Sequence, residues 1–366
     1  MEILSCENVA FKYNESTDYA ISDCTFSVKK GEKIMLCGAS GSGKSTLLRL
    51  LKRELSPRGE LSGNITLMGK DRSELSDRES AEKIGFVMQS PDSQTVCDKV
   101  SAELAFGLES FGVKSGEIQS RVGEMAGFFG IEPLYDRDIS TLSGGQKQLV
   151  ALCSVMATDP DILLLDEPTA QLDPVAAREL LGILDRLNKE MGVTIIIAEH
   201  DPEELFDSCD KILYLAKGKT EFFGTPALTA KYFVKNALEG FLPETAKAFA
   251  RLCDDLPLNV RQGRAKFEKL GVTDIPKQAV TDTERAEPYA LQFKDLWQRY
   301  EKDSPDILKG CDLGIRKGEC YGLLGSNGGG KSTLLRVICG LCKPYMGTVS
   351  LFGKKQKAYK NGSLFR

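Results

Sequence analysis

Three short runs of apolar residues before residue 225 are nearly uninterrupted. They are KIMLC (33–37), ILLLD (162–166) and VTIIIA (193–198). Runs of this length without polar alternation are typical of strands buried on both faces of a parallel sheet. A helical pattern precedes the second run, with apolar residues at Leu149, Leu152, Cys153 and Met156. We therefore predict an α/β fold with ligand-binding residues at the carboxyl ends of the strands.

The pattern changes over residues 226–288. PETAKAFARLCDDL and NVRQGRAKFEKLG place apolar residues at helical spacing, whereas TDIPKQAVTDTERAEP is polar and contains prolines. We predict a first domain over 1–225, a helical extension and linker over 226–288, and a second domain over 289–366.

The chain also repeats itself. The residues that recur 287 positions further on are Tyr13, Gly31, Gly38 and Lys44, as Tyr300, Gly318, Gly325 and Lys331. GNITLMG (63–69) recurs as GTVSLFG (347–353), 284 positions further on. Such constant spacing predicts one fold for both copies.

The second copy contains only the beginning of the first. The counterpart of Gln89 would fall at position 373, beyond Arg366. A half-domain that ended inside its own sheet would expose strand edges and apolar surface. We therefore expect the second unit to be a truncated copy.

Composition narrows the class of protein. The 366 residues are too many for one ordinary domain, and their formal net charge is -4 without a basic run, so we expect no nucleic-acid partner. The amino-terminal MEILSCENVAFKY does not resemble a secretory signal, and no stretch approaches the length of a membrane span.

The eleven cysteines are scattered without a disulfide framework, which fits a protein in a reducing cytosol. We expect a soluble protein that can dock on a membrane protein.

A glycine-rich segment, GASGSGKST (38–46), follows the first apolar run and precedes the helical pattern TLLRLLKREL. This order of strand, turn and helix is typical of a phosphate-binding P-loop. Glycines let backbone N–H groups approach a phosphate, and the helix amino terminus adds partial positive charge. We predict that Lys44 reaches the β and γ phosphates of a nucleotide and that Ser45 binds Mg²⁺.

Carboxylates and a histidine follow the other two runs. Asp166 ends the second run and can hold Mg²⁺, while Glu167 beside it can polarise an attacking water. His200, the only histidine of the chain, follows the third run and is predicted to contact the γ-phosphate.

LSGGQ (142–146) precedes the helical pattern around Leu152. Ser143 is predicted to cap this helix, and Gly144 and Gly145 leave its first N–H groups accessible. The segment therefore predicts a second phosphate-binding helix end, separate from the P-loop.

Taken together, these motifs resemble the nucleotide-binding domain of ABC-type ATPases over nearly all of residues 1–225. By this resemblance GASGSGKST is Walker A, Gln89 is the Q-loop glutamine, LSGGQ is the signature, ILLLDE is Walker B, AQLD (170–173) is the D-loop and His200 is the switch histidine. The second unit resembles the same domain up to about Phe352. The implied fold is that of a P-loop NTPase, with a RecA-like core sheet and a helical subdomain, in two tandem units.

The resemblance implies ATP and Mg²⁺ as cofactors. The implied catalytic residues are Gln89, Glu167 and His200, and the implied Mg²⁺ ligands are Ser45, Gln89, Asp166 and Ser332. The implied nucleotide-binding residues are Tyr13, which would stack on adenine, Gly38, Ser40, Gly41, Gly43, Lys44, Ser45, Thr46, Ser143, Gly144, Gly145, Gln146, Asp173, Tyr300, Gly325, Asn327, Gly328, Gly330, Lys331, Ser332 and Thr333.

The family hydrolyses ATP where the P-loop of one domain faces the signature of another, so the ATPase domains are expected to pair. The Lys331 loop would use the signature of the first unit, and the Lys44 loop would need a signature from elsewhere. We therefore expect this chain to bind Mg-ATP but to hydrolyse it poorly unless first units pair between chains.

Two further segments narrow the resemblance. SPDSQTVCDKVSAELAFGLES (90–110) and LPETAKAFARLCDDLPLNVRQGRAKFEKL (242–270) resemble the energy-coupling factor importers, which take up vitamins or metal ions in prokaryotes. The implied partners are a transmembrane coupling subunit and a substrate-capture membrane subunit, on the cytoplasmic side of the cell membrane. Residues 96–111 would contact the coupling subunit, pack as an amphipathic helix on their own domain, or do both.

Other ABC machines remain as alternatives. A soluble tandem ATPase acting on ribosomes would be expected to have a long, charged helical linker, and this linker has few Lys/Arg clusters. A tandem sugar-importer ATPase is a third reading. A DNA-repair ATPase is disfavoured because no zinc-binding cysteine module interrupts the domain.

Overall fold

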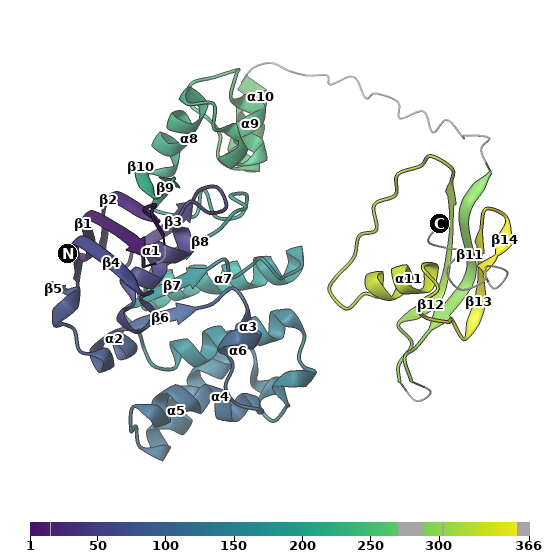
Figure 1. Cartoon of the computed structure of the whole chain (residues 1–366), viewed down its shortest axis with the longest axis horizontal. Helices are drawn as coiled ribbons and strands as arrows, with labels where there is room; N and C mark the ends of the chain where they lie inside the picture. Colours follow the sequence, from purple (N-terminus) through teal and green to yellow (C-terminus); the bar gives the residue numbers. More distant parts are fainter. Residues whose placement is uncertain (15, 270–287, 302–303, 357–366) are drawn as a thin grey trace. The chain divides into compact units, whose positions relative to one another are not determined.

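The computed structural model describes residues 1–14, 16–269, 288–301 and 304–356. The chain forms two compact units, Met1–Asp274 and Ile275–Arg366 (Figure 1). The helices that follow residue 225 belong to the first unit. The domain boundaries given above at 225 and 288 remain predictions.

A six-stranded sheet forms the centre of unit 1. Its order is β10 (Lys219–Gly224), β9 (Lys211–Ala216), β3 (Lys33–Cys37), β8 (Thr194–Ala198), β7 (Ile162–Asp166) and β6 (Ile84–Val87). All neighbours pair in parallel except β10 and β9, which are antiparallel. The three apolar runs are β3, β7 and β8, and all their strand residues are buried. The predicted α/β fold is confirmed, and the carboxyl ends of these three adjacent strands meet at one edge.

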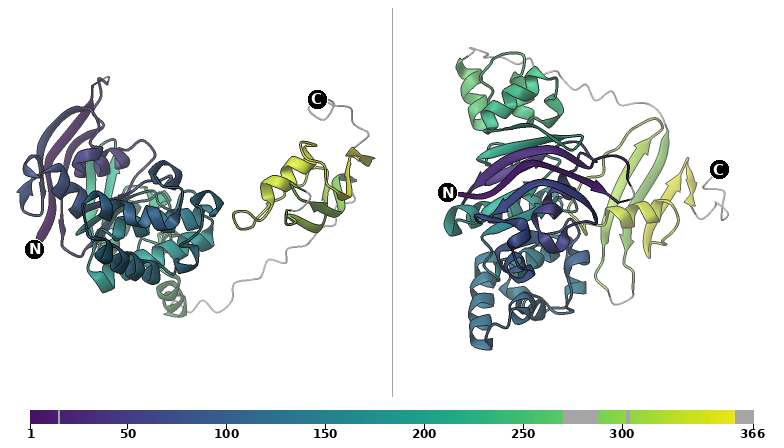
Figure 2. Two further views of the ribbon diagram at one scale, coloured as in Figure 1. Left: turned by 90° about the horizontal axis from the view of Figure 1, so that it is seen from below. Right: turned by 60° about the vertical axis from the view of Figure 1, so that its left-hand side comes forward.

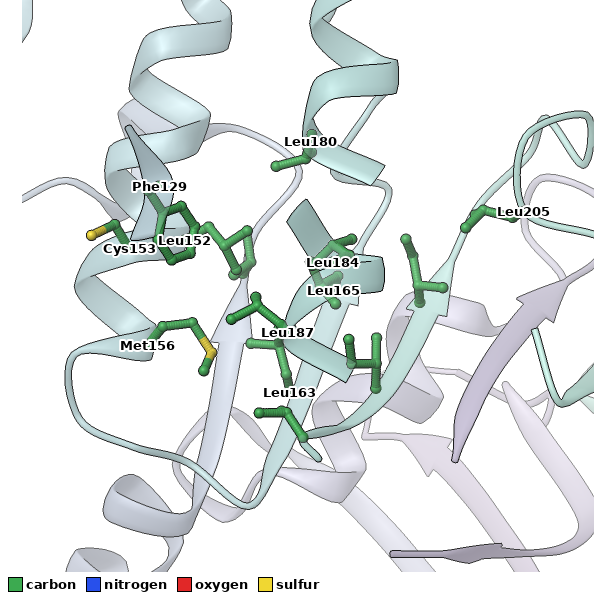
Figure 3. Packing of buried hydrophobic residues seen from close by; sticks show 14 of the residues in the cluster. Phe129, Leu152, Cys153, Met156, Leu163, Leu165, Leu180, Leu184, Leu187 and Leu205 are labelled. Carbon is green, nitrogen blue, oxygen red and sulfur yellow. The ribbon is translucent and has the colours of Figure 1, made fainter. Parts of the chain in front are cut away.

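Both faces of this sheet are covered, which explains why its strands do not alternate between apolar and polar residues. Leu163 and Leu165 of β7 pack with α6 (Gly144–Met156) and α7 (Pro174–Met191) in one cluster (Figure 3). Ile162 and Leu164 point into a second cluster, which contains the leucines of α1 (Lys44–Leu51). The sheet therefore separates two hydrophobic layers.

An antiparallel sheet lies beside the second layer, in the order β2 (Ile21–Lys29), β1 (Glu2–Tyr13), β4 (Gly59–Leu67) and β5 (Lys70–Asp71). The β1–β4 register shifts between Glu7 and Ala10. Asn8 has φ 49° there and Gly63 has φ 86°. A Cβ at Gly63 would lie 2.3 Å from the carbonyl oxygen of Asn8, so this bulge requires glycine.

Two groups of helices lie at opposite ends of unit 1 (Figures 1 and 2). The first contains α3 (Pro91–Gln94), α4 (Val100–Ser110), α5 (Ser115–Phe129) and α6, with α2 (Asp77–Lys83) nearby. The second contains α8 (Pro226–Lys235), α9 (Glu244–Phe249) and α10 (Val260–Lys269). Phe233 of α8 and Phe249 of α9 are buried in the same cluster as β7 and α7. None of the helices in the described part of the chain has the length and apolar composition needed to cross a bilayer.

The helical pattern predicted over PETAKAFARLCDDL is only partly helical. Helix α9 ends at Phe249, and the chain then turns so that Leu256 and Pro257 are buried. The residue directly before a proline disfavours the helical conformation, so Leu256 at the end of the predicted segment is not expected to be helical. The second predicted helix is α10.

Unit 2 repeats the antiparallel sheet. Its order is β12 (Leu308–Arg316), β11 (Tyr289–Gln298), β13 (Met346–Leu351) and β14 (Lys354–Lys355), with α11 (Lys331–Ile338) as the counterpart of α1. Asp295 has φ 49° and Gly347 has φ 91°, which reproduces the bulge at Asn8 and Gly63. The repeat predicted from residue spacing is therefore present in this sheet and helix.

The two units differ where unit 1 has β3. Residues 320–324 correspond to β3 but are not a strand, and Leu324 is 92% exposed. In unit 1, β3 is held between β8 and β9. No strand in the described part of unit 2 pairs with residues 320–324, and a single strand cannot satisfy its own backbone groups.

Replacing Gly85 by alanine is expected to destabilise unit 1 by about 1–3 kcal/mol, because overpacking forces neighbours to move. A Cβ at this position of β6 would lie 2.5 Å from Cγ1 of Val155. Valine is β-branched and cannot swing aside easily. Urea unfolding would measure the change. Gly116→Ala in α5 is the matched control, because no atom lies within 4 Å of its added Cβ. Equal stability of the two variants would contradict the prediction.

Candidate functional site

The glycine-rich segment forms the loop between β3 and α1. Gly43 caps α1 with φ 103°, which a residue with a side chain adopts only with strain. Lys44 is 4% exposed, and its Nζ donates to the carbonyl oxygens of Gly38 at 2.9 Å and Ala39 at 3.3 Å. Burial lowers the pKa of the Lys44 ammonium, and the nearby carboxylate of Glu167 opposes this shift. The loop therefore places the ammonium group of Lys44 at the amino terminus of α1, where backbone N–H groups also favour an anion.

A hydroxyl and a carboxylate meet beside this loop. Ser45 Oγ donates to Asp166 Oδ1 at 2.8 Å, which joins the start of α1 to the end of β7. Burial raises the pKa of Asp166, and the hydrogen bond from Ser45 opposes this shift. Among the described residues, no group of three or more His, Cys, Asp and Glu side chains could hold a metal ion. The Ser45–Asp166 pair fits Mg²⁺, which commonly binds through one or two protein oxygens together with substrate phosphates.

The three residues predicted to be catalytic come together from three segments. Gln89 Nε2 donates to Glu167 Oε2 at 3.0 Å, and His200 Nε2 lies 2.7 Å from Glu167 Oε1. Glu167 has φ 49°, a strained conformation for a residue with a side chain. Its backbone N–H donates to the carbonyl oxygen of Ala198 at 2.9 Å. Both carboxylate oxygens of Glu167 are therefore oriented by neighbours, while its backbone is pinned to β8.

A second glutamate at this edge was missed by the sequence analysis. Glu199 follows β8, is 4% exposed, and accepts hydrogen bonds from the N–H and the hydroxyl of Thr169. An acidic residue directly after a buried strand was the available signal.

LSGGQ adopts the predicted helix cap. Ser143 Oγ accepts from the N–H of Gln146, and Gln146 Oε1 accepts from the N–H of Ser143, which is a capping box. Gly144 and Gly145 begin α6. No hydrogen bond or ion pair in the described part of the chain links residues 143–146 with the Lys44 loop. The structure thus forms the helix end but does not bring it to that loop.

Asp173 and Tyr13, both predicted to bind nucleotide, make local contacts. Asp173 caps α7 and accepts from the N–H groups of Val175 at 3.1 Å and Ala176 at 3.0 Å. Tyr13 packs edge-on against the ring of Phe11, and its hydroxyl lies 2.9 Å from Oγ1 of Thr46. Stacking of Tyr13 on adenine remains a prediction.

The remaining predicted residues of the first loop lie at its tip, where Ser40 and Gly41 are exposed. The second loop reproduces the lysine contacts, because Lys331 Nζ donates to the carbonyl oxygens of Gly325 at 2.6 Å and Ser326 at 2.8 Å. The hydroxyls of Tyr300 and Thr333 are 3.1 Å apart. Asn327, Gly328, Gly330 and Ser332 belong to the same loop and helix start. The described part of unit 2 holds no counterpart of Asp166, Glu167 or His200.

Sequence comparison identifies relatives of the chain. A family model described as ABC transporter matches residues 21–170 and 308–364. A putative ABC transporter ATP-binding protein of Bacillus thuringiensis subsp. konkukian is 39% identical over 349 residues, which cover 95% of this chain and 63% of the relative. One from Methanosarcina mazei is 35% identical over 380 residues, covering 98% of this chain and 64% of the relative. The chain thus spans less than two thirds of the length of these relatives.

Comparison with solved structures also finds similar ABC transporter proteins. CbiO1 from Clostridium perfringens, described as part of the ABC transporter complex cbiONQ, is 31% identical with a TM-score of 0.58, covering 72% of this chain and 98% of that protein. The ATP-binding cassette MJ0796, solved as a dimer in a post-hydrolysis state bound to ADP and Pi, is 27% identical with a TM-score of 0.54. It covers 61% of this chain and 99% of its own. Since the two regions matched by the family model make up more than half of the chain and contain both phosphate loops, the chain belongs to the ABC transporter family.

Proposed function

We propose that this chain is the ATP-binding and ATP-hydrolysing subunit of a membrane transporter. The observation that supports this most strongly is the clamping of Glu167 between Gln89 and His200, beside the Ser45–Asp166 pair. Phosphoryl transfer to water needs groups that bind phosphate, balance its charge and position the water. Four separate segments of unit 1 supply such groups at one edge of the sheet.

Each residue has a role in the proposed reaction. Lys44 and the N–H groups at the start of α1 bind and orient the phosphates of ATP. Ser45 and Asp166 would hold Mg²⁺, which balances negative charge on the phosphates when bound. Glu167 accepts a proton from the attacking water, and Gln89 and His200 hold its two oxygens in place. A carboxylate is suited to this role because both of its oxygens can accept hydrogen bonds.

We also propose that cassettes pair, with Ser143, Gly144 and Gly145 of one cassette facing the phosphate loop of another. Two observations support this. The helix end at Ser143 is built and capped, yet it makes no described contact with the Lys44 loop. In addition, the related cassette MJ0796 was solved as a dimer. Hydrolysis would then need two cassettes to close around ATP.

Within the family, we propose an energy-coupling factor importer for vitamins or metal ions. The likeness to cbiO1, which is part of the complex cbiONQ, supports this choice. Helix α4 buries Val100, Leu104 and Leu108 on one side. Phe106 is 43% exposed, and Val96 just before the helix is 66% exposed. Residues 96–111 thus pack on their own domain and also leave apolar side chains outside it.

A groove of about 520 Å³ lies at the start of this segment, and its lining includes Cys97, Asp98, Asp138 and the Lys147–Asp92 ion pair. Exposed apolar side chains beside a groove are typical of protein interaction sites. We propose that residues 96–111 and this groove contact the transmembrane coupling subunit. The chain would then lie on the cytoplasmic side of a prokaryotic membrane, with the substrate-capture subunit as a further partner.

Val96→Asp and Phe106→Asp are expected to abolish recovery of a polytopic membrane protein with this chain, because charge in an apolar contact is strongly unfavourable. Purification of the tagged protein in mild detergent, followed by mass spectrometry, measures this. Leu228→Asp on α8 is the matched control, since Leu228 is 56% exposed and lies outside the segment. Recovery of ribosomal proteins without a membrane partner would instead support a ribosome-associated ATPase.

A further inference from the structure

Glu199 contacts the turn that begins at Glu167, through Thr169. We propose that Glu199 is a positioning residue that holds Glu167 in its strained conformation through Thr169. This inference rests on the proposed ATP hydrolysis, and it assigns to Glu199 a role in orienting the group that accepts the proton from water.

The contacts of Glu199 link β8, β3 and the segment that follows β7. Its backbone N–H donates to the carbonyl oxygen of Leu36 in β3 at 3.2 Å. Its Oε1 accepts from the N–H of Thr169 at 3.0 Å and from Oγ1 of Thr169 at 2.7 Å. Thr169 belongs to the segment that follows β7. Glu199 therefore connects the sheet to this segment by two partly buried hydrogen bonds.

Thr169 lies within the turn that begins at Glu167. The N–H of Ala170 donates to the carbonyl oxygen of Glu167 at 3.2 Å, which closes the turn. The N–H of Glu167 donates to Ala198, the residue directly before Glu199. Residues 198 and 199 thus hold the turn at its first and third positions.

This double attachment accounts for the positive φ at Glu167. A conformation of this kind costs about 1–3 kcal/mol and persists only where surrounding contacts enforce it. Without the acceptor at position 199, the turn can relax towards negative φ. Relaxation would turn the Glu167 carboxylate away from Gln89 and His200.

A carboxylate suits position 199 because both partners are donors. Burial raises the pKa of Glu199, and the hydrogen bonds from Thr169 oppose this shift. Glu199 does not itself fit the role of base, because its side chain is almost completely buried, whereas Glu167 is partly exposed. Glutamine would keep an acceptor oxygen without the charge.

The test uses the whole chain with Glu199→Ala, Glu199→Gln, Thr169→Val and the double variant Glu199→Ala/Thr169→Val. ATP affinity, kcat and KM are measured for each. We expect Glu199→Ala and Thr169→Val to lower kcat about tenfold, the rate effect of 1.4 kcal/mol, with ATP affinity within about threefold of the original. Glu199→Gln should restore most of the rate. The double variant should be no slower than the slower single variant, because the two side chains act through one contact.

Glu32→Ala is the control for a purely structural effect. Glu32 accepts from the N–H of Lys29 at 2.8 Å and pairs with Lys211 at 3.0 Å, at the end of β3 opposite the phosphate loop. We expect it to lower the melting temperature without lowering kcat. An unchanged kcat in Glu199→Ala would overturn the proposal. Parallel losses of stability and kcat in Glu199→Ala and Glu32→Ala would also overturn it.

Crystal structures separate this inference from the proposed function. The φ angle of Glu167 is expected to become negative in Glu199→Ala, whatever the turnover. A positive φ there would overturn the positioning role even if the chain hydrolyses ATP. If the unaltered chain binds ATP without hydrolysing it at any protein concentration, the proposed function fails, while the φ angle still decides whether Glu199 holds the turn.

Discussion

Replacing Glu167 by glutamine is expected to slow ATP hydrolysis by about 10²–10⁴-fold, the usual contribution of a positioned general base. Glutamine is nearly the same size but cannot accept a proton from water. Its amide would also face the amide of Gln89, which now donates to Glu167 Oε2 at 3.0 Å. ATP affinity should change little, because Lys44 and the backbone of the loop remain in place.

Turnover with excess protein over ATP isolates the chemical step from product release, and it should be measured at concentrations at which cassettes pair. The matched control is Glu204→Gln, since Glu204 pairs with Arg178 on the surface at 2.7 Å. This control should stay within about twofold of the original rate, because surface ion pairs contribute little. Turnover of Glu167→Gln at the original rate would remove Glu167 from the mechanism.

Replacing Lys44 by alanine is expected to weaken ATP binding at the first loop by about 10- to 100-fold. Hydrogen bonds to charged groups contribute about 1.5–3 kcal/mol, and the buried position of Lys44 lowers the effective dielectric constant around its charge. Equilibrium binding of labelled ATP measures the affinity. The number of ATP molecules bound per chain should fall by the share that the first loop contributes.

Lys52→Ala is the control for Lys44→Ala. Lys52 follows α1, and its Nζ donates to the carbonyl oxygens of Ile84 at 2.5 Å and Ser80 at 3.4 Å. Both lysines therefore hold two backbone carbonyls, but only Lys44 does so in the glycine-rich loop. Lys52→Ala should reduce stability and leave ATP affinity unchanged. Equal loss of affinity in both variants would indicate a general effect on folding.

Sequence patterns predicted those features that depend on neighbouring residues. Strands β3, β7 and β8 are continuous apolar runs, and a run of this kind has few alternatives to a buried strand. The predicted helix cap at Ser143 is equally local, because its hydroxyl accepts from a backbone N–H three positions further on. The resemblance then supplied the expectation that Gln89, Glu167 and His200 would meet, although they come from distant segments.

Contacts across the fold that the resemblance does not imply were not predicted. Glu199 and Thr169 are thirty positions apart, and only the pairing of β7 with β8 brings them together. Residues 320–324 match β3 in sequence spacing, yet a strand also needs partners, which the described part of unit 2 does not provide. Apolar spacing predicted a helix over PETAKAFARLCDDL, but α9 ends at Phe249, and Leu256 and Pro257 lie buried beyond it.

The presence of a single histidine, positioned at the carboxylate of Glu167, has a practical consequence. Isotope labelling of histidine would give one imidazole signal from the whole chain, and that signal would come from the edge of the sheet where the phosphate-binding loop lies. Its chemical shift would follow nucleotide arrival, turnover and release at this edge without an introduced probe.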